Sequence, residues 1–333
     1  MQLRHAPVRA LIVFNPAAGQ AASQRQALQA ARDVWLDAGW SVEMQPTAGP
    51  GDGIRLAREA ARAGYDLVAA AGGDGTVNEV VNGIAGTTTA LAALPAGTVN
   101  VWVRELGLPL QPRAAAAALL NARVERIDLG RAGGRYFLLM CGVGFDAAVT
   151  AAVRAEAKRR LGVLAYAFQV VSLAGSWRGT RVSLQLDGVT HRARVLMVVL
   201  GNSQLYGGFV KFTARASLDD GLLDVCVIRG RTLWSAPLKL LSLWTRRFDQ
   251  DADIGYHRAR TVRIESRRPL PVQVDGDYIG TTPMSFECVP GALLALLPPS
   301  LPDSDLLQRP APAARAGRRL LAPLGHRAPG GDA

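Results

Sequence analysis

Hydrophobic and polar positions follow different patterns in the two halves of the chain. Up to about residue 128, short apolar runs alternate with stretches of helical spacing. The pattern predicts strands at 8–14, 40–44, 66–71 and 90–94, and helices at 22–38, 52–63, from 77 and at 113–121. Because strands separated by helices pair in parallel, this half is expected to form a parallel sheet with helices on both faces.

Beyond residue 128, apolar and polar residues alternate as in antiparallel strands. The segment 182–195 alternates on both sides of Asp187-Gly188, which is a strong signal for a hairpin. The pattern predicts further strands at 222–228, 261–264, 272–274, 284–288 and 293–297, and helices at 147–173 and 233–248. From Pro299 onward, prolines, arginines and small residues predict a disordered tail.

These patterns predict an α/β plus β fold in three parts. Residues 1–128 are expected to form a three-layer α/β domain with a parallel sheet, and residues 129–298 an antiparallel β-sandwich domain. Residues 299–333 are expected to form a disordered basic tail. A length of 333 residues fits this division, because single hydrophobic cores stop growing beyond about 250 to 300 residues.

Composition excludes several other classes of protein. The three cysteines and four histidines lie far apart, so the chain has neither a disulfide framework nor zinc-ligand spacing. A reducing, cytoplasmic setting is favoured. The longest apolar stretch, 161–175, is interrupted by Gln169 and Ser172, and it is shorter than the ~20 residues of a bilayer span. We therefore expect a soluble or peripheral protein.

The sharpest chemical feature is Gly72-Gly73-Asp74-Gly75-Thr76, between a predicted strand and a predicted helix. Open α/β sheets bind ligands at the carboxyl ends of their strands, where glycines and helix N-termini accommodate phosphate. A carboxylate beside phosphates requires a cation or a hydroxyl proton between them. Asp74 therefore indicates a metal-assisted phosphate site. The alternative is an ordinary glycine-rich turn in which Asp74 caps the helix.

Two further loops, Asn15-Pro16-Ala17-Ala18-Gly19 and Pro95-Ala-Gly-Thr-Val-Asn100, follow other predicted strands. In a parallel sheet they converge on the same edge as the glycine-rich loop. Each alone is more typical of a turn, whereas the three together favour a ligand site. The chain lacks the phosphate loop that ends in Gly-Lys-Ser/Thr and the motifs of protein kinases. A nucleotide would therefore bind without those devices.

Five motifs follow one another along the chain. They are Gly72-Gly-Asp-Gly-Thr-Val-Asn-Glu79, Leu94-Pro-Ala-Gly-Thr-Val-Asn100, Gly142-Val-Gly-Phe-Asp146, Tyr206-Gly-Gly208 and Ser217-Leu-Asp-Asp-Gly-Leu-Leu-Asp224. Together they resemble the diacylglycerol kinase catalytic-domain family, which includes bacterial lipid kinases and sphingosine and ceramide kinases. The first motif is shared with NAD kinases, and the later ones make the resemblance specific.

The resemblance implies transfer of the γ-phosphoryl group of ATP to a lipid hydroxyl, with Mg²⁺, in a cleft between the two domains. The nucleotide site that it implies consists of Asn15, Pro16, Ala17, Ala18, Gly19, Thr47, Gly72, Gly73, Asp74, Gly75, Thr76 and Thr98. It also implies a Mg²⁺ site made by Asp220 and the main-chain oxygens of Ser217 and Leu222. The same segment is compatible with a simple β-turn.

The resemblance places the proton acceptor in Val274-Asp275-Gly276-Asp277, where the family usually reads Asp-Gly-Glu. Because Asp277 stands in place of the glutamate, either Asp275 or Asp277 could be the base. From sequence alone the Asp-Gly pair is more typical of a hairpin turn. Asp146 is expected at the cleft, with a helix cap as the alternative. The catalytic candidates are Asp74, Asp146, Asp275 and Asp277.

A lipid kinase must reach a substrate that lies at a membrane surface. The stretches 154–168 and 234–248 combine basic with apolar or aromatic residues and would suit an anionic interface, although such stripes are more often the core face of a helix. Residues 129–300 carry 22 Lys and Arg against 13 Asp and Glu, whereas residues 1–128 carry 11 of each. This distribution favours an anionic membrane over a nucleic-acid partner, for which the chain has no basic-aromatic motif.

The leading hypothesis is a cytoplasmic, peripherally membrane-associated kinase of a lipid such as diacylglycerol or a sphingoid lipid. One alternative is a kinase of a soluble substrate such as NAD. Another is a catalytically silent lipid-binding or nucleotide-binding protein on the same scaffold, which would have no need for this set of acids. The pattern indicates neither which lipid is phosphorylated nor the oligomeric state.

Overall fold

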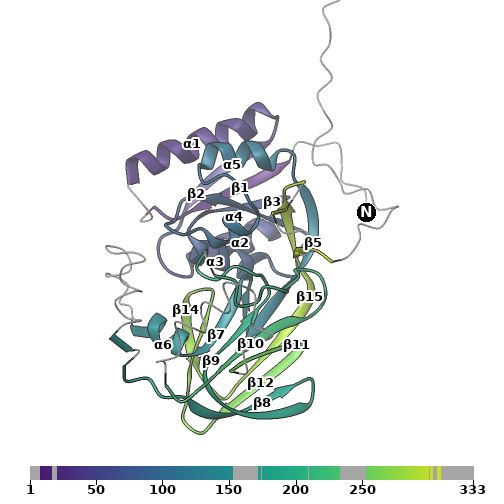
Figure 1. Ribbon diagram of the computed structural model, residues 1–333. Helices are drawn as coiled ribbons and strands as arrows, with labels where there is room; N and C mark the ends of the chain where they lie inside the picture. The colour runs from purple at the N-terminus through teal and green to yellow at the C-terminus, as the bar shows by residue number, and fades with distance from the viewer. Residues whose placement is uncertain are drawn as a thin grey trace, which may run out of the picture.

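A computed structural model of the protein describes residues 8–16, 21–152, 172–173, 175–208, 210–232, 253–299, 301–302 and 306–308. In Figure 1 the helices of the first half lie in the upper part, and antiparallel strands of the second half extend below them. The chain thus forms an α/β unit and a β unit, as the two hydrophobic patterns predict.

The α/β unit is a parallel sheet with helices on both faces. Its strands are β1 (Arg9–Phe14), β2 (Ser41–Pro46), β3 (Leu67–Gly72) and β4 (Ala90–Pro95), paired in the order β2-β1-β3-β4. Its helices are α1 (Ala21–Asp37), α2 (Asp52–Arg62), α3 (Asp74–Ile84), α4 (Val101–Glu105) and α5 (Pro112–Leu119). In Figure 1, α1 and α5 lie above the strands and α2 and α3 below them. Every residue of β3 and β4 is buried, because both faces of the sheet are covered.

The β unit consists of antiparallel strands and one short described helix. The elements are β5 (Arg123–Ala132), β6 (Arg135–Phe137), β7 (Met140–Gly144), α6 (Phe145–Ala152), β8 (Thr180–Leu186), β9 (Val189–Gly201), β10 (Leu223–Arg229), β11 (Ile254–Ala259), β12 (Thr261–Ser266), β13 (Pro271–Val274), β14 (Asp277–Thr281) and β15 (Met284–Leu297). The hairpin predicted around Asp187-Gly188 is confirmed: the two residues connect β8 to β9 and both have positive φ, which a tight hairpin turn requires.

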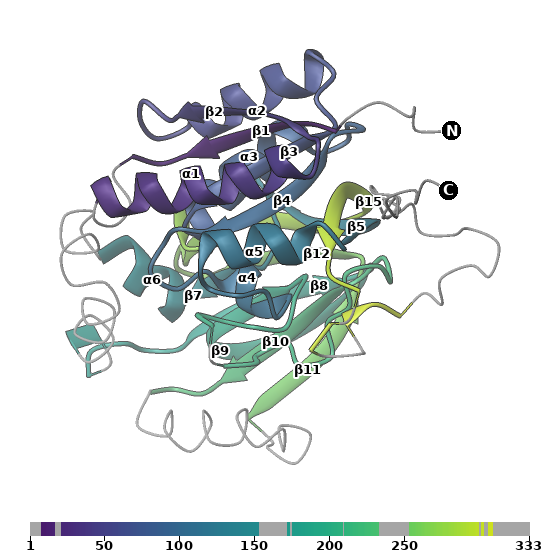
Figure 2. The same cartoon turned by 90° about the horizontal axis from the view of Figure 1, so that it is seen from above.

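Strand β15 joins the two units. It pairs antiparallel with β5 and β12, and its last part pairs in parallel with β4 through Leu294 and Ala295. In Figure 2, β15 runs beside β4 and β5 where the units meet. Residues 293–297, which the pattern assigns to the second domain, therefore also complete the sheet of the first. Alternation alone identifies a strand but not the sheet edge that it completes.

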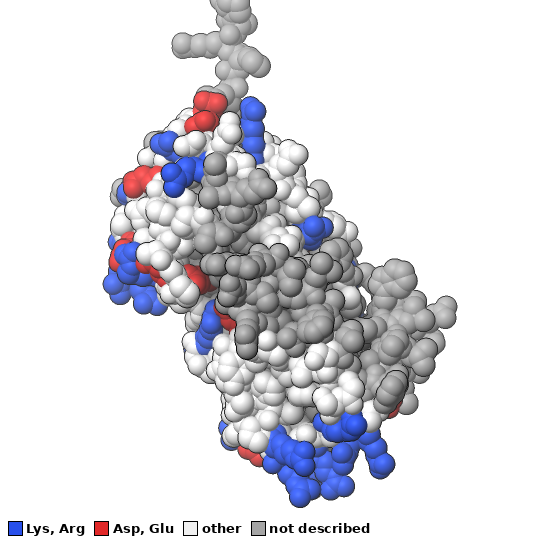
Figure 3. Space-filling view, turned by 90° about the vertical axis from the view of Figure 1, so that its left-hand side faces the viewer, with Lys and Arg blue, Asp and Glu red and all other residues white. Residues whose placement is uncertain are grey.

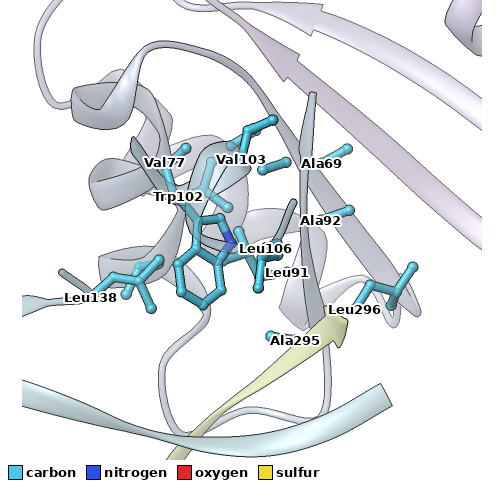
Figure 4. Packing of buried hydrophobic residues seen from close by; sticks show 14 of the residues in the cluster. Ala69, Val77, Leu91, Ala92, Trp102, Val103, Leu106, Leu138, Ala295 and Leu296 are labelled. Carbon is cyan, nitrogen blue, oxygen red and sulfur yellow. The ribbon is translucent and has the colours of Figure 1, made fainter. Parts of the chain in front are cut away.

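One buried cluster continues from the first unit into the second. Trp102 is 1% exposed and packs among apolar side chains beneath the loops at the end of the parallel sheet. Figure 4 shows Val77 and Leu91 around its ring, with Leu138 and Leu296 reaching the same cluster from the other unit. Since the shared core is continuous, the two units hold each other in a defined position at the site described below.

The C-terminal segment departs from the expected disorder at one point. Leu306 is fully buried, and its carbonyl accepts a hydrogen bond of 2.8 Å from the N–H of Leu218. The N–H of Gln308 donates to Asp219 at 2.8 Å. Residues 306–308 therefore contact the rest of the protein within the segment for which composition predicts disorder, because Leu306 fills a core position that composition does not reveal. The predicted helices at 147–173 and 233–248 lie largely outside the described residues.

Candidate active site

The loops that follow β1, β3 and β4 meet at one edge of the parallel sheet. The N–H of Asn15 donates to the carbonyl of Ala71 at 3.3 Å, and the N–H of Ala96 donates to the carbonyl of Gly72 at 3.3 Å. The predicted convergence of the three loops is thus confirmed. In the order β2-β1-β3-β4, the loops after β1 and β3 flank the point where the strand order reverses, which is where open α/β sheets bind ligands.

The glycines of these loops allow unusually close contact. A Cβ atom at Gly97 would collide with the Cα of Gly73, and a Cβ at Gly72 would collide with the side chain of Thr76. The Asn100 side chain fixes the loop after β4. Its Oδ1 accepts a hydrogen bond from the Gly97 N–H at 3.0 Å, and its Nδ2 donates to the Gly97 carbonyl at 2.8 Å. Glycine is required here because the two backbones touch.

Asp74 is the first residue of α3, and its carboxylate reaches across to the next loop. Its Oδ1 accepts a hydrogen bond of 3.2 Å from the N–H of Trp102, the second residue of α4. The cap of α3 is Gly73, with no side-chain cap bond. Asp74 therefore lies inside the helix, one residue after the cap position that the sequence alternative assigns to it. It ties α4 to the glycine-rich loop and leaves the carboxylate at the phosphate-binding edge.

The residues that follow in the same motif extend in opposite directions. Glu79 accepts hydrogen bonds from the N–H groups of Gly51 and Gly53, at 2.8 and 2.9 Å, and so holds the start of α2. Asn78 is 1% exposed and faces the β unit. Its Nδ2 donates to the carbonyl of Tyr136 at 2.9 Å and to Oδ2 of Asp275 at 2.8 Å. A single turn of α3 therefore connects both parts of the molecule.

Asp275 lies in the turn between β13 and β14, with φ of 46°. Its carboxylate accepts four hydrogen bonds, from Asn78 and from the main-chain N–H groups of Leu138, Leu139 and Met140, at 2.8 to 3.0 Å. Burial raises its pKa to about 6, and the same donors act in the opposite direction. Each oxygen already accepts two bonds, which fills the lone pairs of a carboxylate.

Asp277, two residues further on, is in a different environment. Its Oδ2 accepts a hydrogen bond of 2.7 Å from Arg135, and its side chain is 42% exposed. The guanidinium of Arg135 also donates to Oδ1 of Asn78 at 2.8 and 3.0 Å. Arg135 thus links Asp277 to the same asparagine that binds Asp275. The remaining oxygen of Asp277 is open to a ligand.

Asp146, near the start of α6, is buried and accepts a hydrogen bond of 2.7 Å from Nε2 of Gln273. Burial raises its pKa to about 6, and the bond from Gln273 lowers it in part. The other end of Gln273 accepts from the N–H of Gly276 at 2.7 Å. Asp146, which is 8% exposed, therefore supports the turn that contains Asp275 and Asp277 through Gln273.

The predicted Mg²⁺ turn is occupied by protein groups. Asp220 accepts from the N–H of Leu222 at 2.9 Å and pairs with the guanidinium of Arg258. Within the described residues, no three His, Cys, Asp or Glu side chains lie close enough together to hold a metal ion. The carboxylate that the resemblance assigns to Mg²⁺ is thus paired with an arginine. The assigned site has one carboxylate and two main-chain oxygens, so the role of Ser217, Asp220 and Leu222 in binding Mg²⁺ stays a prediction. The hydroxyl of Ser217 donates to Asp219 at 3.0 Å.

The other predicted nucleotide residues are placed as follows. The N–H of Thr47 donates to the carbonyl of Phe14 at 2.8 Å, which brings the end of β2 to the loop edge. Pro16 is exposed after β1, and Thr98 is exposed between Gly97 and Asn100. Ala17, Ala18 and Gly19 lie outside the described residues.

Comparisons with known proteins bear on the same two units. Residues 9–132 match the diacylglycerol kinase catalytic domain, and residues 140–297 match the YegS C-terminal NAD kinase beta sandwich-like domain. A "Probable lipid kinase YegS-like" of Pseudomonas putida is 34% identical over 296 residues, which cover 88% of this chain and 97% of that protein. The chain belongs to the diacylglycerol kinase catalytic-domain family.

Other members of the family support this assignment. A diacylglycerol kinase of Bacillus subtilis is 31% identical over 84% of this chain and 92% of its own length. The crystal structure of a diacylglycerol kinase of Bacillus anthracis has a TM-score of 0.74 at 28% identity, and the match covers 87% of this chain and 97% of that one. The α/β plus β fold and the family resemblance are therefore confirmed, and the protein is a kinase by family.

The sequence patterns do not identify three residues that belong to the site. Asn78 lies within the glycine-rich motif, so its position was available as a signal. Arg135 and Gln273 occupy ordinary positions in β6 and β13, and no pattern marks them. Their importance arises only from the tertiary contacts with Asn78, Asp277 and Asp146.

Proposed function

We propose that the protein transfers the γ-phosphoryl group of ATP to the hydroxyl of a membrane lipid such as diacylglycerol or a sphingoid lipid. The observation that carries this proposal is the hydrogen bond between Asn78 and Asp275. It joins the phosphate-binding edge of the α/β unit to the carboxylate-bearing turn of the β unit. A phosphoryl donor and an acceptor hydroxyl bound on the two sides would lie in neighbouring positions, as phosphoryl transfer requires.

MgATP is the proposed donor. The loops around Gly72–Thr76, Asn15 and Thr98 would bind its phosphates through main-chain N–H groups and the N-terminus of α3. The Asp74 carboxylate would face the metal ion of the substrate rather than bare phosphate oxygens, since two negative groups at that distance repel each other. The backbone contact between Gly73 and Gly97 sets the shape of this cradle.

Asp277 is the better candidate for the general base. Its carboxylate has one oxygen held by Arg135 and one open to substrate, whereas both oxygens of Asp275 are filled by four donors. A lipid hydroxyl bound against Asp277 would transfer its proton to that carboxylate as the new P–O bond forms. Asp275 and Asp146 would position the turn.

The names of the relatives support a lipid as the acceptor, because those compared are lipid or diacylglycerol kinases. No helix among the described residues is long and apolar enough to cross a bilayer. We further propose that the enzyme acts in the cytoplasm and binds an anionic membrane surface peripherally, where its substrate lies.

The deciding experiment is incubation of the pure protein with labelled ATP, Mg²⁺ and either a panel of lipids in mixed micelles or NAD. Lipid extraction then separates labelled lipid from labelled NADP in the aqueous phase. The proposal predicts label in a lipid, and loss of that label with Asp277→Asn. Label in NADP but in no lipid would establish the soluble-substrate alternative. Transfer to neither acceptor would favour the silent binding protein.

A further inference from the structure

One face of the β unit carries a cluster of arginines remote from the site. Residues on β8, β9 and β12 alternate between the core and solvent, and Val182, Leu184 and Ile264 are on the buried side. The opposite side of these strands is exposed at Arg181, Arg192, Arg194 and Arg267. Strand alternation therefore places four guanidinium groups on one surface.

The register brings like charges together on this face. Arg181 lies directly opposite Arg194 on the neighbouring strand, an arrangement that is unfavourable unless an anion lies nearby. The one acidic residue that lines this surface, Glu265, is already paired with Arg263 at 2.9 Å. Among the described residues, Arg181, Arg192 and Arg267 have no ion-pair partner. The surface therefore keeps a strong positive charge.

These side chains line an open groove of about 620 Å³. Its lining is Arg181, Val182, Ser183, Arg192, Ala193, Arg194, Glu265, Ser266 and Arg267. Figure 3 shows Lys and Arg side chains gathered at the lower end of the molecule, the end at which Figure 1 places β8 and β12. The guanidinium groups and the hydroxyl of Ser183 match the oxygens of a phosphate diester in both charge and hydrogen bonding.

The groove is too far from the proposed base to bind the reacting lipid. Within β9, Arg194 lies seven residues before Gly201, which pairs with Met140. The N–H of Met140 binds Asp275, two residues from the proposed base Asp277. Seven residues of strand span about 23 Å at ~3.3 Å per residue. The groove is therefore a separate anion site.

We propose that this groove, made by Arg181, Arg192, Arg194 and Arg267, docks the protein onto the phosphate head groups of an anionic bilayer surface. The inference rests on the proposed function, which requires the enzyme to work at a membrane. A nucleic-acid partner is disfavoured because no aromatic side chain lines the groove on which bases would stack.

The test compares the full chain with the triple variant Arg181→Gln, Arg192→Gln, Arg267→Gln in sedimentation with vesicles of phosphatidylcholine containing 30% phosphatidylglycerol. A matched control removes the same charge from the α/β unit with Arg25→Gln, Arg58→Gln, Arg62→Gln, all three exposed in the structure. We expect roughly 100-fold weaker partitioning of the groove variant, or about 3 kcal/mol at 1.4 kcal/mol per tenfold, and little change in the control.

Three results would overturn the proposal. These are equal binding by the groove variant and the wild type, an equal loss in the control variant, and equal binding to vesicles of phosphatidylcholine alone. Tight binding of a short RNA duplex that depends on the same arginines, without vesicle binding, would assign the groove to nucleic acid instead. Displacement from vesicles by millimolar inorganic phosphate would identify a site for free phosphate.

Activity in neutral detergent micelles separates this proposal from the proposed function. The groove variant is expected to phosphorylate lipid in such micelles at the wild-type rate, because the groove does not contact the reacting groups. If the wild type phosphorylates no lipid, the proposed function fails whatever the vesicle result. If the wild type is active and both proteins bind vesicles alike, only the docking proposal fails.

Discussion

The amide of Asn78 donates a hydrogen bond of 2.8 Å to the carboxylate of Asp275, across 197 residues of sequence. Asn78 belongs to the helix that begins at the glycine-rich loop, and Asp275 to a turn of the β unit. Three main-chain N–H groups donate further hydrogen bonds to the same carboxylate. This contact fixes the two halves of the proposed reaction site relative to each other.

Removal of either partner should destabilise the fold more than a surface substitution does. We expect Asp275→Asn to lower the free energy of unfolding by about 2 to 4 kcal/mol, because the new amide group would face N–H donors that lose their acceptor. A double-mutant cycle with Asn78→Ala, followed by urea denaturation, should give a coupling energy of about 1 to 3 kcal/mol. The exposed Asn121→Ala is the control, and additive effects of the two site variants would contradict the interpretation.

Asp277 should affect catalysis and not stability. We expect Asp277→Asn to lower kcat for lipid phosphorylation by about 10²- to 10⁴-fold, the usual contribution of a general base, with an unchanged KM for ATP. Asp277→Glu should keep substantial activity, since it retains the carboxylate. A fully active Asp277→Asn enzyme would remove Asp277 from the mechanism.

The contact between the two glycine-bearing loops should control nucleotide binding. In Gly97→Ala the new methyl group would meet the backbone of Gly73 and force the loops apart. We expect the affinity for ATP, measured by calorimetry, to fall at least about tenfold, which corresponds to 1.4 kcal/mol. A Cβ at Gly49 meets nothing within 4 Å, so Gly49→Ala should bind ATP as the wild type does. Equal affinities of all three proteins would show that the close approach is not needed.

Asp146 should make stability depend on pH. Burial raises its pKa from 3.8 to about 6 in the folded protein, so the folded state holds this proton more tightly than the unfolded state. Its contribution to stability is therefore complete below about pH 4 and is lost as the pH rises through about 6. A shift of this size corresponds to about 3 kcal/mol.

The comparison with Asp146→Asn isolates this effect, because asparagine can still accept the bond from Gln273 but does not ionise. Between about pH 4 and 7 the unfolding free energy of the wild type should fall relative to that of the variant by up to about 3 kcal/mol. Urea denaturation at several pH values measures the difference. If the difference in unfolding free energy between the two proteins does not change with pH, burial does not raise the pKa of Asp146 in the folded protein.

Local sequence patterns are sufficient to predict the helices and strands and the place where the glycine-rich loops meet. Strands at 8–14 and 66–71 were recognisable because buried parallel strands are continuous apolar runs, and the Asp187-Gly188 hairpin because its turn requires positive φ. Glycine-rich loops after parallel strands converge by geometry alone, so contact between Gly73 and Gly97 followed from strand order.

Tertiary structure alone decided which groups act together. The sequence left the base open between Asp275 and Asp277, and only the surroundings distinguish them: four donors fill the first carboxylate, and Arg135 leaves one oxygen of the second open. Likewise, the pairing of Asp220 with Arg258 and the assembly of four arginines on one sheet face depend on strand register. Short-range spacing determines elements and loops, whereas the partners of a charged side chain are set by residues far away in the chain.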